Sequence, residues 1–266
     1  MGIYLPRRGG IGDNLSFGIG GDGSQGGIGY GGPGGGGGGG AFSDLVIAAG
    51  PDAYYQQNEL SGTVATDSMG LIDGTYEGVV LPVLGSTPLK VSDPKTSVLY
   101  TGTQGTCKVV PGVGSPLHTS GDIAIETMYY LPVGLGASYK GLVHKGSFAA
   151  TYYAINAWVQ SGTGDHYLYI ENGVGGGSFF VATPPNSQVR HLAVNWSAAG
   201  AVTVYLDGSL IGSGTSVRSV NTENINIGYN LRQISVLKGN ASDTAFYSRL
   251  LTPAEILQRA TKALIG

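Results

Sequence analysis

The side chains in this sequence best suited to holding a ligand are aromatic rings and amides that recur at every second position of one segment. In the run TYYAINAWVQ at 151 to 160, alternation places Tyr152, Asn156 and Trp158 on one face and mainly apolar residues on the other. Aromatic rings stack on sugar faces and amides hydrogen-bond to hydroxyl groups, so the pattern suits contact with a glycan or a protein. The same rings could instead pack beneath loops or against a neighbouring subunit.

Further candidates for this face lie in the segments that follow, provided that those segments join the same sheet. Two tyrosines come from the next segment, and a histidine, an amide and a tyrosine come from the segments around His191. The candidate carbohydrate-binding residues are Tyr152, Asn156, Trp158, Tyr167, Tyr169, Asn195 and Tyr205.

Other reactive side chains lack the spacing that catalysis or metal binding requires. Cys107 is the single cysteine, which excludes an internal disulfide and a cysteine-based zinc site, and a half-buried strand position is expected for it. The GxGxxG-like matches near the N-terminus precede no helix and so do not predict a phosphate site. The histidines show no metal-ligand spacing and are expected on the surface of strands or turns; they are His118, His144, His166 and His191.

The element that would position many of these side chains is a β-meander from Gln188 to Gly208. Apolar residues alternate with polar or small ones on both sides of the link Ser-Ala-Ala-Gly, and period two predicts strands with one buried face. The short link favours antiparallel pairing, and Asp207-Gly208 predicts a second reversal toward Leu210 and Ile211. The residues expected to face the core are Leu192, Val194, Trp196, Val202, Val204 and Leu206.

Similar short runs fill most of the chain after residue 53, separated by Gly, Pro, Asn and Asp. Around a dozen short strands with such turns predict a two-sheet sandwich and not a βαβ fold. Two short helices are expected, one between Ser43 and Gly50 and one from Thr252 to Ala263, where Glu255 completes a capping box. The other expected strands span 75–84, 97–102, 107–112, 122–132, 141–146, 151–160, 166–172, 178–183, 224–230 and 232–239.

Composition argues against several classes of partner. Only 12% of the 266 residues are charged, the formal net charge is -3 and the pI is about 5.7, so no basic field is available for nucleic acid or an anionic membrane. No apolar run reaches the roughly 18 residues of a membrane helix, and no signal-peptide pattern opens the sequence. The chain is expected to stay in a cytosol or to leave it as part of an assembly.

Residues 1 to 40 are dense in glycine and end in the run GGPGGGGGGG. Glycine loses the most backbone freedom on ordering and adds no side chain to bury, so this segment is not expected to fold alone. It is either an extended arm that docks on a neighbouring subunit or a flexible linker. The residues expected to anchor such an arm are Ile3, Tyr4, Leu5, Arg7, Arg8, Phe17 and Tyr30.

Three segments together resemble the concanavalin A-like jelly roll in its laminin G-like form. They are AYYQQNELSGTVATDS from Ala53, followed by Gly74-Thr75-Tyr76; the meander, with Val189-Arg190-His191 where the family usually has Trp-His-His; and AFYSRLLTPAEI from Ala245. The resemblance covers about residues 43 to 264. It implies an all-β jelly-roll sandwich at 41 to 266, with short N- and C-terminal helices and a glycine-rich extended N-terminal arm at 1 to 40.

Domains of this family chiefly bind glycans or proteins, and some hold calcium through loop carboxylates and carbonyls. Here the aspartates are scattered among turns, where a carboxylate commonly closes an Asx turn, so no cofactor is expected and calcium is the one metal left open. Related glucanases place several carboxylates on alternate positions of one strand. The segment from Asp122 to Glu126 offers two, with Tyr129 and Tyr130 after them, so no enzymatic hydrolysis is expected.

These features together resemble accessory structural proteins of tailed bacteriophages, such as minor tail, fibre or capsid decoration proteins. The leading hypothesis is a virion component that assembles in the host cytoplasm, forms a homo-oligomer and is anchored to other virion proteins through residues 1–40. Its sandwich would then face a host-surface glycan. The alternative hypothesis is a soluble carbohydrate-binding module on a flexible linker. Neither hypothesis includes catalysis, nucleic acid binding or membrane insertion.

Overall fold

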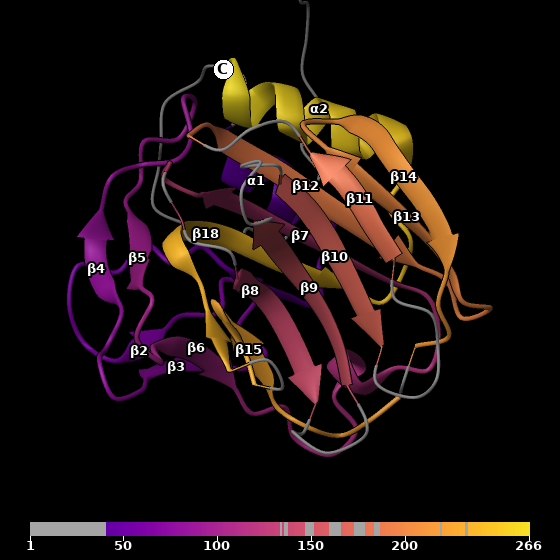
Figure 1. Cartoon of the computed structure of the whole chain (residues 1–266), viewed down its shortest axis with the longest axis horizontal. Helices are drawn as coiled ribbons and strands as arrows, with labels where there is room; N and C mark the ends of the chain where they lie inside the picture. Colours follow the sequence, from indigo (N-terminus) through magenta and orange to yellow (C-terminus); the bar gives the residue numbers. More distant parts are fainter. Residues whose placement is uncertain are drawn as a thin grey trace, which may run out of the picture. The chain divides into compact units, whose positions relative to one another are not determined.

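The computed structural model describes residues 41–266 except 134, 136–137, 147–151, 160–165, 173–178, 184–186, 219 and 232–233. The described residues form two eight-stranded sheets, here called sheet A and sheet B, whose strands pair antiparallel around one large hydrophobic core (Figure 1). A two-stranded sheet and two α-helices accompany them. The predicted all-β sandwich is therefore confirmed.

Sheet A has the strand order β14-β13-β12-β7-β18-β5-β4, and β1 pairs with the second half of β18. Its β12, β13 and β14 form the predicted meander, and the turn at Asp207 and Gly208 has φ values of 52° and 83°, as a two-residue hairpin of type I′ requires. The strands of sheet A are β1 (Ala53–Tyr55), β4 (Val83–Ser86), β5 (Ser97–Thr101), β7 (Ile123–Tyr130), β12 (Val189–Trp196), β13 (Ala201–Leu206), β14 (Ser209–Thr215) and β18 (Lys238–Tyr247).

Sheet B has the strand order β11-β10-β9-β8-β15-β6-β3-β2. After β15, the chain forms a small hairpin of β16 (Tyr229–Asn230) and β17 (Ser235–Val236) that contacts β8, and a 3-10 turn lies at Pro116–His118. The strands of sheet B are β2 (Val64–Ala65), β3 (Gly74–Glu77), β6 (Thr106–Val109), β8 (Ser138–Gly146), β9 (Tyr152–Val159), β10 (His166–Asn172), β11 (Phe179–Thr183) and β15 (Ile225–Ile227).

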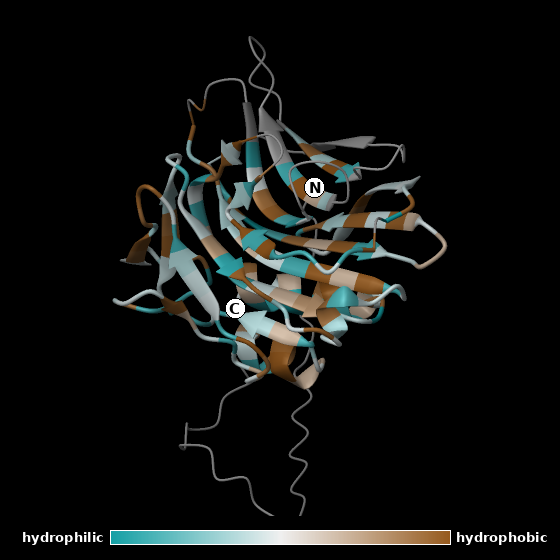
Figure 2. Cartoon of the chain, turned by 90° about the horizontal axis from the view of Figure 1, so that it is seen from below, coloured by the Kyte–Doolittle hydropathy of each residue, from teal (hydrophilic) through white to brown (hydrophobic). Residues whose placement is uncertain are grey.

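Alternate residues of the two sheets fill the core between them, and hydrophobic and hydrophilic bands accordingly alternate along the strands (Figure 2). All six meander residues that were predicted to face the core do so. Trp196 is the largest of them; its indole N–H donates to the backbone oxygen of Ser216, and its ring meets that of Tyr153 edge-on at 5.7 Å. The buried ring thus has a partner for its polar edge.

Helices α1 (Phe42–Ala48) and α2 (Pro253–Leu264) cover the face of sheet A that points away from the core. A second apolar cluster fills this layer, in which Phe42 and Ile256 from the helices join Met128 of β7. The predicted capping box of α2 is confirmed: the hydroxyl of Thr252 accepts from the Glu255 N–H at 3.2 Å, and the Glu255 carboxylate accepts from the Thr252 N–H at 2.8 Å. The central strands β7 and β18 of sheet A are therefore buried on both faces, whereas its outer strands β4 and β14 are partly exposed.

Three expected strands proved wrong in their extent. The run at 75–84 is two strands in different sheets, because the chain crosses over after Gly78, where φ is 132° and an added Cβ would lie 2.0 Å from the carbonyl oxygen of Gln104. The run at 224–230 breaks at Gly228, which has φ 80° and packs against the ring of Tyr100. The run at 232–239 contains β17 and only the start of β18.

Candidate functional site

A cleft of about 580 Å³ opens on the face of sheet B that points away from the core. Its floor is made by β3, β6 and β15, where Glu77 pairs with Thr106 and Lys108 pairs with Asn226. The residues between them in sequence, such as Cys107, belong to the core, so alternation turns these polar side chains outward. The cleft thus has a polar floor on a rigid sheet.

The floor contains an ion pair that is open to solvent. The ammonium of Lys108 lies 3.2 Å from the carboxylate of Glu77, with side-chain exposures of 32% and 45%. An exposed pair of this kind contributes little to stability. Because both groups are exposed, the remaining ammonium hydrogens of Lys108 and the carboxylate lone pairs of Glu77 can bond to the hydroxyl groups of a ligand.

One wall of the cleft is the β16–β17 hairpin, which presents Tyr229 and Leu231. The hairpin covers the outer face of β8 and β9: the Asn230 side-chain amide donates to Oδ1 of Asn156 at 2.8 Å, and an added Cβ on Gly141 would lie 2.3 Å from the Asn230 nitrogen. Gly141 and Asn156 are cross-strand partners on that face. Burial raises the pKa of Tyr229, so its hydroxyl is neutral and can donate at physiological pH.

The remaining walls come from loops at either end of the floor strands. Glu223 and Asn224 precede β15, and the N–H of Gly146 donates to the Asn224 oxygen at 3.2 Å. Opposite them, Val79 and Gln104 line the cleft where their loops touch at Gly78. A ring, amides and carboxylates therefore surround the polar floor.

The structure places five of the seven predicted carbohydrate-binding residues on β9 and β10 of sheet B, which β8 separates from the floor of this cleft. Asn156 pairs with Tyr169, and Trp158 pairs with Tyr167. Asn156 is fully buried beneath the hairpin, while Tyr167 and Tyr169 are half-buried. The side chains of Tyr152 and Trp158 lie outside the described part of the chain, and the binding role of this group stays a prediction.

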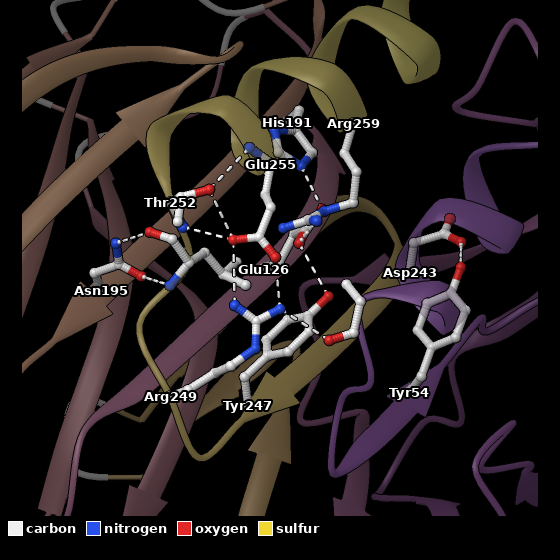
Figure 3. A network of polar contacts seen from close by, with 12 residues as sticks. Tyr54, Glu126, His191, Asn195, Asp243, Tyr247, Arg249, Thr252, Glu255 and Arg259 are labelled. Carbon is white, nitrogen blue, oxygen red and sulfur yellow. Dashed lines mark hydrogen bonds and ion pairs between the residues drawn. The ribbon is translucent and has the colours of Figure 1, made fainter.

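Asn195 and Tyr205 do not share that face, so the expected single surface does not form. They belong to β12 and β13 in sheet A, whereas β9 and β10 belong to sheet B. Both are buried beneath the helix layer, where the amide of Asn195 donates to the Leu251 oxygen at 2.8 Å and accepts from its N–H at 2.9 Å (Figure 3). Asn195 therefore holds the segment that leads into α2.

The two carboxylates at Asp122 and Glu126 also have structural partners. Glu126 is fully buried and accepts from Nε of Arg259 at 2.8 and 2.9 Å and from the ring of His191 at 2.7 Å (Figure 3). Burial alone would raise the pKa of Glu126, but the bond and charge of His191 and the charge of Arg259 hold it below its ordinary value. Asp122 accepts from the Ala198 N–H at 2.8 Å.

The expected surface position of the histidines is wrong for His144 and His191, which are both fully buried. His191 lies under the helix layer, where its ring meets that of Phe42 edge-on. His118 contacts the Pro111 oxygen at 3.2 Å, and the side chain of His166 lies outside the described residues. Cys107 is fully buried, not half-buried, and burial raises its pKa.

The aspartate Asp67 closes a loop as the turn interpretation expected. Its carboxylate accepts four backbone N–H groups, from Tyr54, Met69, Leu71 and Ile72, at 2.8 to 3.1 Å. Among the residues that the structure describes, no three metal-ligating side chains converge. In the same residues no helix has the length and apolar character to cross a membrane.

Sequence reasoning missed the floor and walls of the cleft. Lys108 lies between Cys107 and Val109, and Asn226 lies between two isoleucines, so a lone polar residue in a short apolar strand was the available signal. Predicting that β3, β6 and β15 lie side by side would have required knowledge of the strand order in sheet B. The predicted arm residues Ile3, Tyr4, Leu5, Arg7, Arg8, Phe17 and Tyr30 lie outside the described residues.

Comparison with known proteins gives a family and several structural relatives. A laminin G-like family model, described as the concanavalin A-like lectin/glucanases superfamily, matches residues 114–257. No curated protein sequence matches the chain. Among solved structures, domain 4 of AbnA, a GH43 extracellular arabinanase from Geobacillus stearothermophilus in complex with arabinotriose, has a TM-score of 0.55 and 21% identity, covering 79% of this chain and 98% of that one.

Binding domains of botulinum neurotoxins are also similar in fold. The binding domain of neurotoxin DC in complex with SialylT has a TM-score of 0.58 and 10% identity, and the match covers 81% of this chain. A structure of botulinum neurotoxin type C, whose cell entry is described as dependent upon interaction with two ganglioside molecules, has a TM-score of 0.57 and 11% identity. The chain spans about half of each neurotoxin chain, since 52% of each is covered.

Proposed function

Because the chain belongs to the concanavalin A-like lectin/glucanases superfamily, we propose that its sandwich is a carbohydrate-binding module that holds a glycan in the cleft over β3, β6 and β15. The observation that carries this proposal is the cleft itself, with a polar floor and the ring of Tyr229 in one wall. The module binds its ligand without cleaving it. Its structural relatives in complex with arabinotriose and SialylT support a glycan as the ligand class.

The cleft residues suit the two surfaces of a sugar. The Tyr229 ring offers an apolar face for the C–H side of a pyranose or furanose ring. Lys108 donates to hydroxyl or ring oxygens, and the carboxylate of Glu77 accepts from a neighbouring hydroxyl. A ligand that bridges both groups replaces their solvent contacts without breaking a stable internal bond.

Binding is tested by calorimetry with arabinotriose and by a glycan array that includes neutral and sialylated glycans, using the full chain. Tyr229→Ala is expected to weaken binding about tenfold, since loss of a stacked ring costs roughly 1.4 kcal/mol. Tyr169→Ala is the matched control, because it removes a ring of the same type from β10, outside the cleft. Loss of binding in Tyr169→Ala alone would move the site to β9 and β10, and binding to no glycan would refute the proposal.

A second candidate function rests on the glycine-rich residues 1–40. In this proposal the chain is a structural virion component of a tailed bacteriophage, and its arm joins other virion proteins while the sandwich touches a host-surface glycan. Deleting residues 1–40 should then leave glycan binding unchanged but remove the protein from assembled particles, as measured by mass spectrometry of purified virions. Full incorporation of the deletion variant would contradict the anchoring role, and sedimentation of the full chain tests the predicted homo-oligomer.

A further inference from the structure

We propose that Lys145 is a positioning residue for the cleft, and that its protonation sets how firmly the wall carrying Glu223 and Asn224 is held and thus how tightly a glycan binds. This inference rests on the proposed carbohydrate-binding function, whose site it regulates. Lys145 itself does not line the cleft.

Lys145 lies near the end of β8, with its side chain buried beneath the wall. It pairs with Tyr153 of β9 and Ile225 of β15, which are both core residues, so its side chain lies on the core side of sheet B. The residue is 1% exposed. Its ammonium donates to the backbone oxygen of Asn221 and, at 2.8 Å, to Oδ1 of the same residue. A buried amine thus holds a loop residue by two bonds.

Asn221 links Lys145 to the cleft wall through a further hydrogen bond. Its Oδ1 also accepts from the Glu223 N–H at 3.1 Å, which closes the turn that leads into the wall. The next residue of β8, Gly146, donates to the Asn224 oxygen at 3.2 Å. Two successive residues of β8 therefore fix the wall, one through the main chain and one through the Lys145 side chain.

The charged groups around Lys145 come from the neighbouring loops. Burial, followed by the charge of Arg218, lowers the pKa of Lys145 from 10.5 to about 8, and the carboxylate of Glu223 opposes this shift. Arg218 donates to the Gly121 oxygen at 2.6 Å and lies over the ring of Tyr153. Burial lowers the pKa of Arg218, and the negative charge of Asp122 opposes this shift and so favours the charged form. Tyr153 is itself uncharged at these pH values, because burial raises its pKa to about 12.

Loss of the Lys145 proton weakens the wall but stabilises the fold as a whole. Above about pH 8 the bonds to Asn221 lose their charge assistance. Since the unfolded chain keeps this proton up to about pH 10.5, the contribution of Lys145 to stability rises between pH 8 and 10.5. We therefore expect glycan affinity to fall by about fivefold over this range. Over the same range the contribution of Lys145 to the free energy of unfolding should increase. A purely structural lysine would not produce these opposite trends.

The test combines an NMR titration with binding measurements on the full chain. The backbone amide of Glu223 should shift with a midpoint near pH 8, and the shift should vanish in Lys145→Met. Arabinotriose, or the array glycan that binds best, should bind wild type more weakly at pH 9.5 than at pH 7. Lys145→Arg keeps its charge and should remove this difference. Lys262→Met on α2 is the control and should behave as wild type.

The outcomes separate this inference from the proposed function. A Glu223 amide that does not titrate near pH 8 in wild type overturns the inference, even if Lys145→Met fails to fold. Affinity that is equal at both pH values in wild type also overturns it. If no glycan binds at any pH, the carbohydrate-binding function fails, and the amide titration alone still decides whether Lys145 holds the wall.

Discussion

Replacing Gly141 with alanine tests whether the β16–β17 hairpin shapes the cleft. An added Cβ would lie 2.3 Å from the Asn230 nitrogen, 2.6 Å from the Tyr229 carbonyl carbon and 2.9 Å from the Ser235 oxygen. All three atoms are backbone, so the strain cannot be relieved by rotating a side chain. Ordinary contact begins at 3.4 Å, and the hairpin must therefore retreat by about 1 Å.

The retreat should affect stability and binding together. Overpacking of this kind costs about 1 to 3 kcal/mol, and a cost of about 2 kcal/mol corresponds to a fall of roughly 4 to 8 °C in Tm for a domain of this size. Moving the hairpin also displaces Tyr229 from its place in the cleft wall and stretches the bond between Asn230 and Asn156. Glycan affinity should fall at least about tenfold.

Thermal unfolding and calorimetry with the bound glycan measure the two effects. Gly112→Ala is the matched control, because an added Cβ there meets nothing within 4 Å. It should leave both Tm and affinity unchanged. If Gly141→Ala melts and binds as Gly112→Ala does, the hairpin does not rest on β8 as described, and the reasoning about this wall is refuted.

Two further predictions concern the helix layer behind sheet A. Arg259→Met should destabilise the fold by about 3 to 5 kcal/mol in urea unfolding, since it leaves the buried carboxylate of Glu126 without its cation, and adding Glu126→Gln should recover part of the loss. Failure of the double variant to recover any stability would argue against this charge balance. The hydrogen bond from Arg249, with those from Thr252, lowers the pKa of Glu255 from 4.5 to about 2, so its contribution is complete above about pH 4.5 and is lost as the pH falls toward 2. Glu255→Gln should cost about 0.5 to 1 kcal/mol at pH 7, and a difference that persists at pH 2 would contradict the assignment.

Local patterns were enough to predict the elements that obey local rules. The meander alternates at period two with a short link, and its register and buried residues follow from that alternation. Thr252 and Glu255 mark the start of α2 because the cap is made by neighbours in sequence. In both cases the residues that determine the structure lie within one segment.

β18 shows where local patterns fail. Its sequence, KGNASDTAFY, is mostly small and polar, yet nearly all of it is buried because β18 lies inside sheet A with a helix layer on one face and the core on the other. Its register also shifts between Ser242 and Ala245, where Asp243 has φ 54°. Small side chains suit a strand that is packed on both faces, but they carry no periodic signal.

For a similar reason, the sequence predicted the positions of the candidate binding residues only in part. Alternation assigned Asn156, Tyr167 and Tyr169 to one side of their strands, and the pairing of β9 with β10 brings these positions together. Asn195 was assigned to the same surface although it lies in the other sheet, because strand order across a sandwich depends on long-range pairing. Predicting the cleft would also have required the long-range pairing of β3, β6 and β15.

The place of β18 also bears on how the protein is made. During synthesis β1, β5 and β7 leave the ribosome long before β18, which pairs with all three of them. Until then the unpaired edges of the nascent sheet are exposed to other chains. We expect the sandwich to close late, with chaperones shielding those edges while translation continues.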